Sequence, residues 1–153
     1  MMKAKTFLGF TLLFLLIGGL LSFISSPSGS SKCSGDNEYA SGLGKLGAYK
    51  LIKDYRIEMK KGEGSRSYMI SLKAGLKYRF LPVNSPDNKK NMIMSIYMSK
   101  NKGMMLATSF NPASKKHYPT IDFACRTTGT FYLFFEFEGD EKGCGVGLFS
   151  VAN

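Results

Sequence analysis

Apolar and polar residues alternate along most of the chain beyond residue 49, with the period of two that is typical of β-strands. In the clearest window, Phe131, Leu133, Phe135 and Phe137 alternate with Tyr132, Phe134, Glu136 and Glu138. Similar windows cover residues 55–60, 68–73, 76–81, 92–98 and 121–125, and a last strand is expected at 146–151. Each window predicts a strand with one buried face and one wetter face.

Turn-forming residues separate these windows, among them Ala74-Gly75, the segment 82–88, Asn111-Pro112 and Thr128-Gly129. With residues 104–110 counted as a strand, the pattern predicts about eight strands and no long helix between them. Such a series favours an all-β, antiparallel sandwich or barrel over any α/β arrangement.

The N-terminus has the three-part layout of a secretory signal. Lys3 and Lys5 precede an apolar run from Phe7 to Ile24, and a Ser-rich stretch follows it. The run is longer than the ~7–15 residues of a cleaved core and shorter than the ~20 that span a bilayer. Two alternatives stay open: a signal peptide cleaved after Ser26, or an uncleaved helical anchor.

This reading divides the chain into three parts. Residues 1–26 are expected to be the signal peptide or anchor, 27–48 a Ser/Gly-rich tether, and 49–153 the β-sandwich domain. The tether is expected to contain at most a short helical turn around Leu43 and Leu46. Either fate of the N-terminal segment places the domain outside the cytoplasm, in the periplasm, at the cell surface or beyond it.

A net charge of +10 narrows the range of partners. The surplus lies largely in lysine pairs, at residues 60–61, 89–90, 100 and 102, and 115–116. Such a field suits an acidic polymer or an anionic lipid surface, whereas nucleic acid is not expected for an exported chain. A solvated surface with charged loop tips is the simpler alternative.

Three segments resemble a known family: Ser71 to Phe80 (SLKAGLKYRF), Phe123 to Phe135 (FACRTTGTFYLFF) and Gly143 to Phe149 (GCGVGLF). They are similar to bacterial pre-peptidase C-terminal domains and to exported Bacteroidetes-type proteins that end in a similar Gly-Cys segment. Gly75 and Gly129 match positions where a tight turn needs no Cβ. The resemblance covers residues 50–152 and implies a jelly-roll-like sandwich whose role is binding or display.

Three cysteines in an oxidising compartment predict one disulfide and one cysteine left over. Cys125 and Cys144 flank the predicted strand at 130–138 and are the expected pair, with two buried thiols as the alternative. Cys33 is then free or paired with another chain. A zinc site built from these cysteines and His117 lacks any local CxxC or HxxxH spacing, so no metal is expected.

Other side chains that carry chemistry have simpler interpretations. His117 could act with a carboxylate such as Asp122, but no GxSxG elbow accompanies it and it lies in a Lys-Lys-His-Tyr-Pro loop. Met92, Met94 and Met98 are in phase with Ile96, which indicates core packing and not a copper site; Met104 and Met105 are the methionines expected to be exposed.

Glu136 and Glu138 are expected side by side on one strand face, where they would suit a calcium ion, a glycosidase pair or simply solvent. The sequence therefore predicts a non-enzymatic binding or display module of the cell envelope that needs no cofactor. Its candidate partner surface is formed by Tyr132, Phe134, Glu136 and Glu138, and its partner is an envelope protein, an anionic polymer or a lipid surface. The alternatives are a membrane-anchored subunit of an envelope assembly and a secreted hydrolase.

Overall fold

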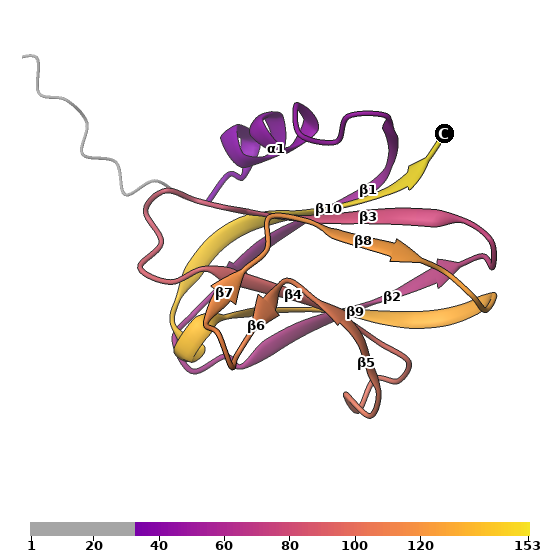
Figure 1. Ribbon diagram of the computed structural model, residues 1–153. Helices are drawn as coiled ribbons and strands as arrows, with labels where there is room; N and C mark the ends of the chain where they lie inside the picture. The colour runs from indigo at the N-terminus through magenta and orange to yellow at the C-terminus, as the bar shows by residue number, and fades with distance from the viewer. Residues whose placement is uncertain (1–32) are drawn as a thin grey trace, which may run out of the picture. The chain divides into compact units, whose positions relative to one another are not determined.

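The computed structural model describes residues 33–153, which form two antiparallel four-stranded sheets packed face to face (Figure 1). The first sheet has the order β1 (Tyr49–Met59), β10 (Gly143–Ala152), β3 (Lys77–Asn84) and β8 (Ile121–Ala124). The second has the order β2 (Ser65–Leu72), β9 (Gly129–Phe137), β4 (Met92–Tyr97) and β5 (Met105–Thr108). The predicted all-β antiparallel sandwich is confirmed.

Two further strands, β6 (Phe110–Asn111) and β7 (Lys116–His117), pair as a small ribbon beside the second sheet. They bring the described strands to ten, because the window predicted at 104–110 divides into β5 and β6 and the His117 loop contains a strand of its own. A single 3-10 turn, η1 (Glu138–Asp140), joins β9 to β10. Within residues 33–153 no helix has the length and apolarity that a membrane span requires. The predicted signal or anchor lies outside the described residues.

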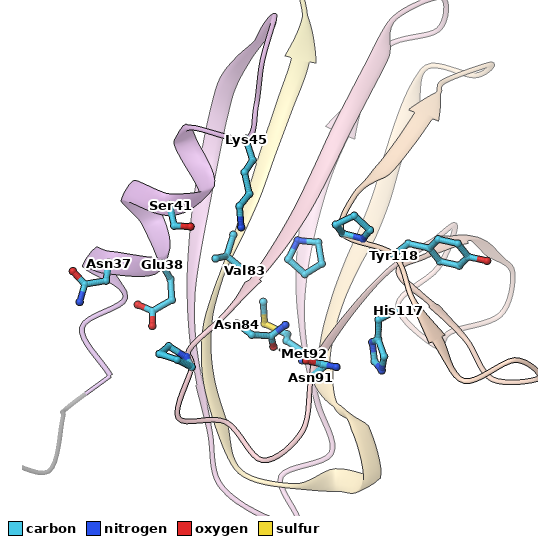
Figure 2. A pocket seen from close by; sticks show the side chains of 13 residues that line it. Asn37, Glu38, Ser41, Lys45, Val83, Asn84, Asn91, Met92, His117 and Tyr118 are labelled. Carbon is cyan, nitrogen blue, oxygen red and sulfur yellow. Dashed lines mark hydrogen bonds between the residues drawn. The ribbon is translucent and has the colours of Figure 1, made fainter.

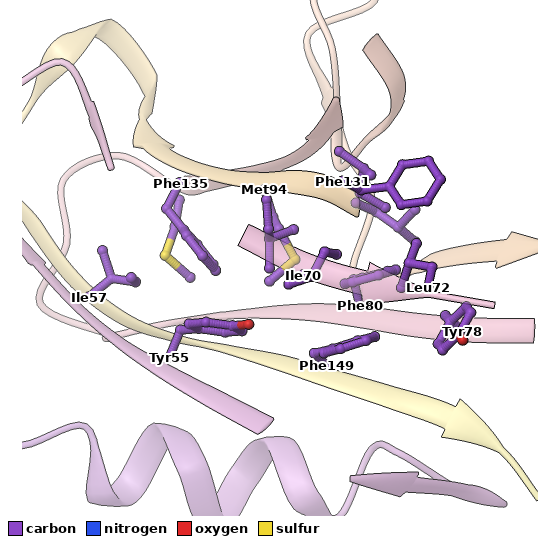
Figure 3. Packing of buried hydrophobic residues seen from close by; sticks show 14 of the residues in the cluster. Tyr55, Ile57, Ile70, Leu72, Tyr78, Phe80, Met94, Phe131, Phe135 and Phe149 are labelled. Carbon is purple, nitrogen blue, oxygen red and sulfur yellow. The ribbon is translucent and has the colours of Figure 1, made fainter. Parts of the chain in front are cut away.

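The core between the sheets is built from the inward positions that the alternation predicts (Figure 3). Phe131, Leu133, Phe135 and Phe137 of β9 are all buried, and Phe135 packs 5.6 Å, centre to centre, from Tyr55 of the opposite sheet. Glycines of β10 make this packing possible: a Cβ on Gly147 would lie 2.2 Å from the Phe135 ring. The Gly-Cys segment is therefore a strand that gives room to large aromatics across the core.

A short helix, α1 (Asp36–Leu43), covers the outer face of the first sheet. It closes a second, smaller cluster formed by Leu46, Leu81, Val83, Val146 and Leu148. Gly42 allows the close approach, because a Cβ there would lie 2.6 Å from Leu148. Residues 33–48 are thus part of the folded unit, whereas the sequence predicted a tether there. β3 and β10 carry apolar residues on both faces, because one face lies in the core and α1 covers the other.

The disulfide joins Cys33 to Cys144, with a Cα–Cα separation of 5.7 Å, and the predicted Cys125–Cys144 pair is wrong. The sheet register gives the reason. Cys144 lies at the end of the first sheet where β3 finishes, while Cys125 follows β8 at the end where β3 begins. The two are separated by a length of strand on the order of 20 Å, far beyond disulfide reach. Cys125 is a buried thiol, and it donates a hydrogen bond to the carbonyl oxygen of Thr127 at 3.1 Å.

Candidate functional site

Large apolar side chains form a row across the outer face of the second sheet. Met69 of β2 lies opposite Tyr132 of β9, Tyr132 lies opposite Tyr97 of β4, and Tyr97 lies opposite Met105 of β5. Met69 is 69 % exposed and Met105 is 52 % exposed, and both tyrosines are half-buried. We call these four residues the apolar row.

The residues of the row occupy strand positions that point away from the core. The neighbours of Tyr132, Phe131 and Leu133, point into the core, so the predicted register of β9 is confirmed. On the first sheet, apolar outward positions such as Val146 and Leu148 are covered by α1. No helix in residues 33–153 covers the row (Figure 1).

Phe134 also points to this outer face but is only 6 % exposed. The prediction that Phe134 belongs to an accessible contact surface is therefore wrong. The Tyr97 ring packs edge-on against it at 5.2 Å, and the Lys102 ammonium lies 5.1 Å from the centre of its ring. The same Lys102 ammonium makes an ion pair with Glu136 at 2.9 Å. The loop between β4 and β5 therefore folds back over the sheet and covers Phe134.

A groove of about 530 Å³ lies beside the row on the same face. Ile93, Ser95 and Tyr97 of β4 line it, together with Lys102 of the β4–β5 loop and Phe110 of β6. The Ser95 hydroxyl bonds Thr108 across β4 and β5 at 2.9 Å. The outer face thus offers an apolar row with a partly polar groove next to it, which is the composition of a surface that binds.

The two acidic candidates have different partners. Glu138 follows β9 in η1, and its carboxylate lies 3.4 Å from Nε2 of His117, whose ring packs on Phe110 at 4.5 Å. Glu136 is bound to Lys102. Both glutamates line the same groove of the outer face, where a basic side chain or a histidine lies against each of them. Residues 33–153 contain no group of three His, Cys, Asp or Glu side chains able to hold a metal ion.

His117 also lines a second hollow of about 550 Å³, between α1 and the loops that follow β3 and β7 (Figure 2). Asn37 of α1 faces it from one side, with His117 on the other, and Asn84 and Asn91 between them. The side-chain oxygen of Asn84 accepts a hydrogen bond from the backbone N–H of Met92 at 2.5 Å, so this amide supports the loop. Within residues 33–153 no hydroxyl or thiol is hydrogen-bonded to His117, whose partner is the Glu138 carboxylate.

Asp122, the other carboxylate weighed as a partner of His117, is bound elsewhere. Arg79 donates two hydrogen bonds to it, at 2.6 and 2.8 Å, and the same guanidinium stacks on the Tyr49 ring. The Arg79 guanidinium holds the pKa of Asp122 below its usual value. Arg79 and Asp122 therefore tie β3 to β8.

The methionines divide between core and surface. Met92 and Met94 are buried, whereas Met98, Met104 and Met105 are exposed. The prediction that Met98 packs in the core is therefore wrong. Sequence reasoning missed Met69 and Tyr97 as site residues. The available signal was a large apolar residue at an outward position in each of several strand windows, which becomes a row only once the strand order is known.

Comparisons with known proteins bear on the fold. No family model matches the chain, and no curated protein matches it at a significant level. Among solved structures it is similar to Aeromonas hydrophila PliG, a periplasmic lysozyme inhibitor of g-type lysozyme, with a TM-score of 0.51 and 8 % identity. The match covers 65 % of this chain and 84 % of PliG. The likeness shows the fold.

A second similar structure is the pre-peptidase C-terminal domain of collagenase from Bacillus anthracis, with a TM-score of 0.48 and 14 % identity. That match covers 66 % of this chain and 89 % of that domain. Both neighbours are compared through backbone arrangement, and their identities are too low to carry over any residue. The predicted likeness to Bacteroidetes-type proteins stays a prediction.

Proposed function

We propose that this protein is an exported, non-enzymatic module that binds a protein of the cell envelope through the outer face of its second sheet. The observation that carries the proposal is the apolar row, Met69–Tyr132–Tyr97–Met105, which crosses all four strands. Large apolar side chains gathered on one open surface mark interaction sites more often than scattered ones do.

The chemistry of the row suits a protein partner. Tyrosine offers a rigid apolar ring with a hydroxyl that can bond at the rim of an interface, and methionine adapts its shape to what it meets. Met69 is exposed in the free chain, so its transfer from water into an interface would contribute favourable free energy to binding. The neighbouring groove and the Lys102–Glu136 pair supply polar groups around this apolar centre.

The likeness to PliG supports a protein-binding role. PliG is a periplasmic inhibitor of g-type lysozyme, so this sandwich arrangement serves in that protein to engage another protein. Export is supported by the signal-like N-terminal sequence and by the Cys33–Cys144 disulfide, which persists in oxidising compartments. The anchored alternative differs only in whether the N-terminal segment is retained.

Catalysis is the weaker interpretation for the same surface. A hydrolase would need a nucleophile or an activated water held by converging groups. The two glutamates are instead bound by other side chains: Glu138 lies against His117, and Glu136 forms an ion pair with Lys102. Binding accounts for the row, whereas catalysis leaves it without a role.

Site-specific photo-crosslinking in cells that produce the protein tests the proposal. A photoreactive residue at position 69 or 105 is expected to give a discrete protein adduct, because both positions lie in the row. Ile52 of β1 is the matched control, since it is apolar, 50 % exposed and part of the other sheet. Identical adducts at all three positions, or none at 69 and 105, would contradict the proposal.

A further inference from the structure

At one end of the sandwich, three connections between strands carry basic residues and no acidic residue. Lys73 lies in the turn between β2 and β3, Lys77 begins β3, and Arg126 lies in the turn between β8 and β9. Lys100 lies in the loop between β4 and β5, which leaves the second sheet at the same end. We call these four residues the basic end. No Asp or Glu occurs in residues 73–77, 98–105 or 125–130.

The two turns of the basic end form one continuous surface. Gly75 donates a backbone hydrogen bond to Cys125, and Cys125 donates one to Leu76. The Thr128 hydroxyl oxygen accepts a further bond from the Ala74 N–H at 2.9 Å. Figure 1 shows the β2–β3 and β8–β9 connections side by side. Lys73, Lys77 and Arg126 are therefore held close together by the fold.

Among residues 33–153, the four charges of the basic end have no ion-pair partner. The nearest carboxylates along their strands, Asp122 and Glu136, are already bound to Arg79 and Lys102. The positive potential of the basic end is therefore left to act on solvent and on whatever approaches it.

The opposite end, where Cys33 meets Cys144, has at least as many basic residues, but they lie among acidic ones. Lys60, Lys61, Lys89 and Lys142 line one groove there together with Glu58, Glu63 and Asp87. Lys61 forms an ion pair with Glu141 at 3.0 Å and holds the pKa of that carboxyl below its usual value. The backbone N–H of Lys60 likewise lowers the pKa of Glu63, with Arg66 acting in the same direction. The two ends therefore differ in net charge and not in the number of their basic residues.

Exposed apolar side chains stand among the lysines of the basic end. Leu76 is 40 % exposed between Lys73 and Lys77, and Met98 and Met104 are exposed on either side of Lys100. A solvated charged turn has no need of these residues. Basic residues around protruding leucine and methionine form the combination that adsorbs to a bilayer, since the charges meet anionic headgroups while the apolar side chains enter the interface.

We propose that the basic end is a docking surface for an anionic phospholipid membrane, independent of which protein the outer face of the second sheet engages. The loop that carries Lys100 borders both surfaces, because its Lys102 lines the groove of the outer face. Each basic residue close to such a surface strengthens binding about fivefold. The four together are expected to contribute more than about 100-fold, and salt is expected to weaken the attraction.

Vesicle binding of the full chain, in the form that the cell exports, tests the proposal. The vesicles contain phosphatidylcholine alone or with ~30 % phosphatidylglycerol. Lys3 and Lys5 of the N-terminal segment also favour the anionic vesicles if that segment is retained, so two variants that share the same N-terminus are compared. One variant carries Lys73→Gln, Lys77→Gln, Lys100→Gln and Arg126→Gln. The control carries Lys60→Gln, Lys61→Gln, Lys89→Gln and Lys142→Gln, which removes the same net charge from the other end.

The expected result is a loss of about 100-fold in affinity for the anionic vesicles in the first variant and less than about tenfold in the second. Equal losses in the two variants would overturn the proposal, because net charge alone would then explain the binding. Failure of the unaltered chain to prefer the anionic vesicles would overturn it as well.

A fluorescence probe reports on insertion. The chain contains no tryptophan, so Leu76→Trp introduces a single reporter, and Leu43→Trp on α1 is the matched control because both leucines are 40 % exposed. Emission of Leu76→Trp is expected to shift to shorter wavelength with anionic vesicles, while Leu43→Trp stays unchanged. Tight binding to polyglutamate with no shift at position 76 on vesicles would show an acidic polymer as the ligand and overturn the membrane proposal.

Discussion

The ammonium group of Lys102 lies over the ring of Phe134, 5.1 Å from its centre, and keeps that ring from solvent on the open face of the second sheet. Phe134 would otherwise extend the exposed apolar surface next to Tyr97. The loop between β4 and β5 thus sets the size of the surface that the free protein presents.

Removing the Lys102 side chain should uncover Phe134. Lys102→Ala loses both the contact with the ring and the ion pair with Glu136, at a cost of about 0.5–1 kcal/mol in the free energy of unfolding. Urea denaturation measures that cost, and binding of a dye for exposed apolar surface should increase. Lys100→Ala, in the same loop, should change neither quantity; equal behaviour of the two variants would show that Lys102 does not cover the ring.

The Cys33–Cys144 disulfide should hold α1 and the first sheet together. It links residues 111 positions apart, and its loss is expected to cost about 3 kcal/mol or more, because the unfolded chain regains the freedom of a long loop. Intact mass measured without reductant should show a two-proton loss in Cys125→Ala and none in Cys33→Ser. A two-proton loss that survives Cys33→Ser would mean that Cys125 can reach Cys144.

Gly147 should tolerate no side chain. A Cβ at this position would lie 2.2 Å from Phe135, so Gly147→Ala is expected to destabilise the fold by about 2–3 kcal/mol. Gly129→Ala is the control, since its Cβ would meet nothing within 4 Å. Adding Phe135→Leu to Gly147→Ala should cost less than the two changes summed, whereas strict additivity of the unfolding free energies would argue against the contact.

The Arg79–Asp122 pair should make stability fall in acid. Because Arg79 lowers the pKa of folded Asp122, the pair contributes fully above the unfolded pKa, near 3.8, and its contribution is lost as pH falls through the lower folded value. Asp122→Asn is therefore expected to be less stable than the unaltered chain at pH 7, by about 0.5–1 kcal/mol for a partly exposed pair. The difference should shrink as pH falls below 3.8; a constant difference down to pH 2 would contradict this reasoning.

The strands could be predicted because their signal is local. In β9 the buried set Phe131, Leu133, Phe135 and Phe137 follows from alternation alone, since every second side chain faces the core. Residue-by-residue alternation also placed Tyr132 on the outer face.

The features that escaped prediction depend on which segments become neighbours. Cys33 meets Cys144 only because α1 returns along the first sheet, and Met69, Tyr97 and Met105 align only in the strand order of the second sheet. Phe134 is buried by a lysine 32 residues before it in the chain, which no local pattern reveals. Position along a strand predicts which way a side chain points, but long-range pairing decides what covers it.

The apolar row is the proposed protein-binding surface of this molecule. The most direct test is to measure the dissociation constant for the partner found by crosslinking. It is compared between the unaltered chain, the double variant Met69→Glu, Met105→Glu and the control Ile52→Glu. Both row methionines are more than half exposed, so these changes leave the core intact. Burying charged side chains at the centre of an interface is expected to weaken binding about 30-fold or more, while Ile52→Glu leaves it unchanged. Unchanged affinity in the Met69→Glu, Met105→Glu variant would contradict the account.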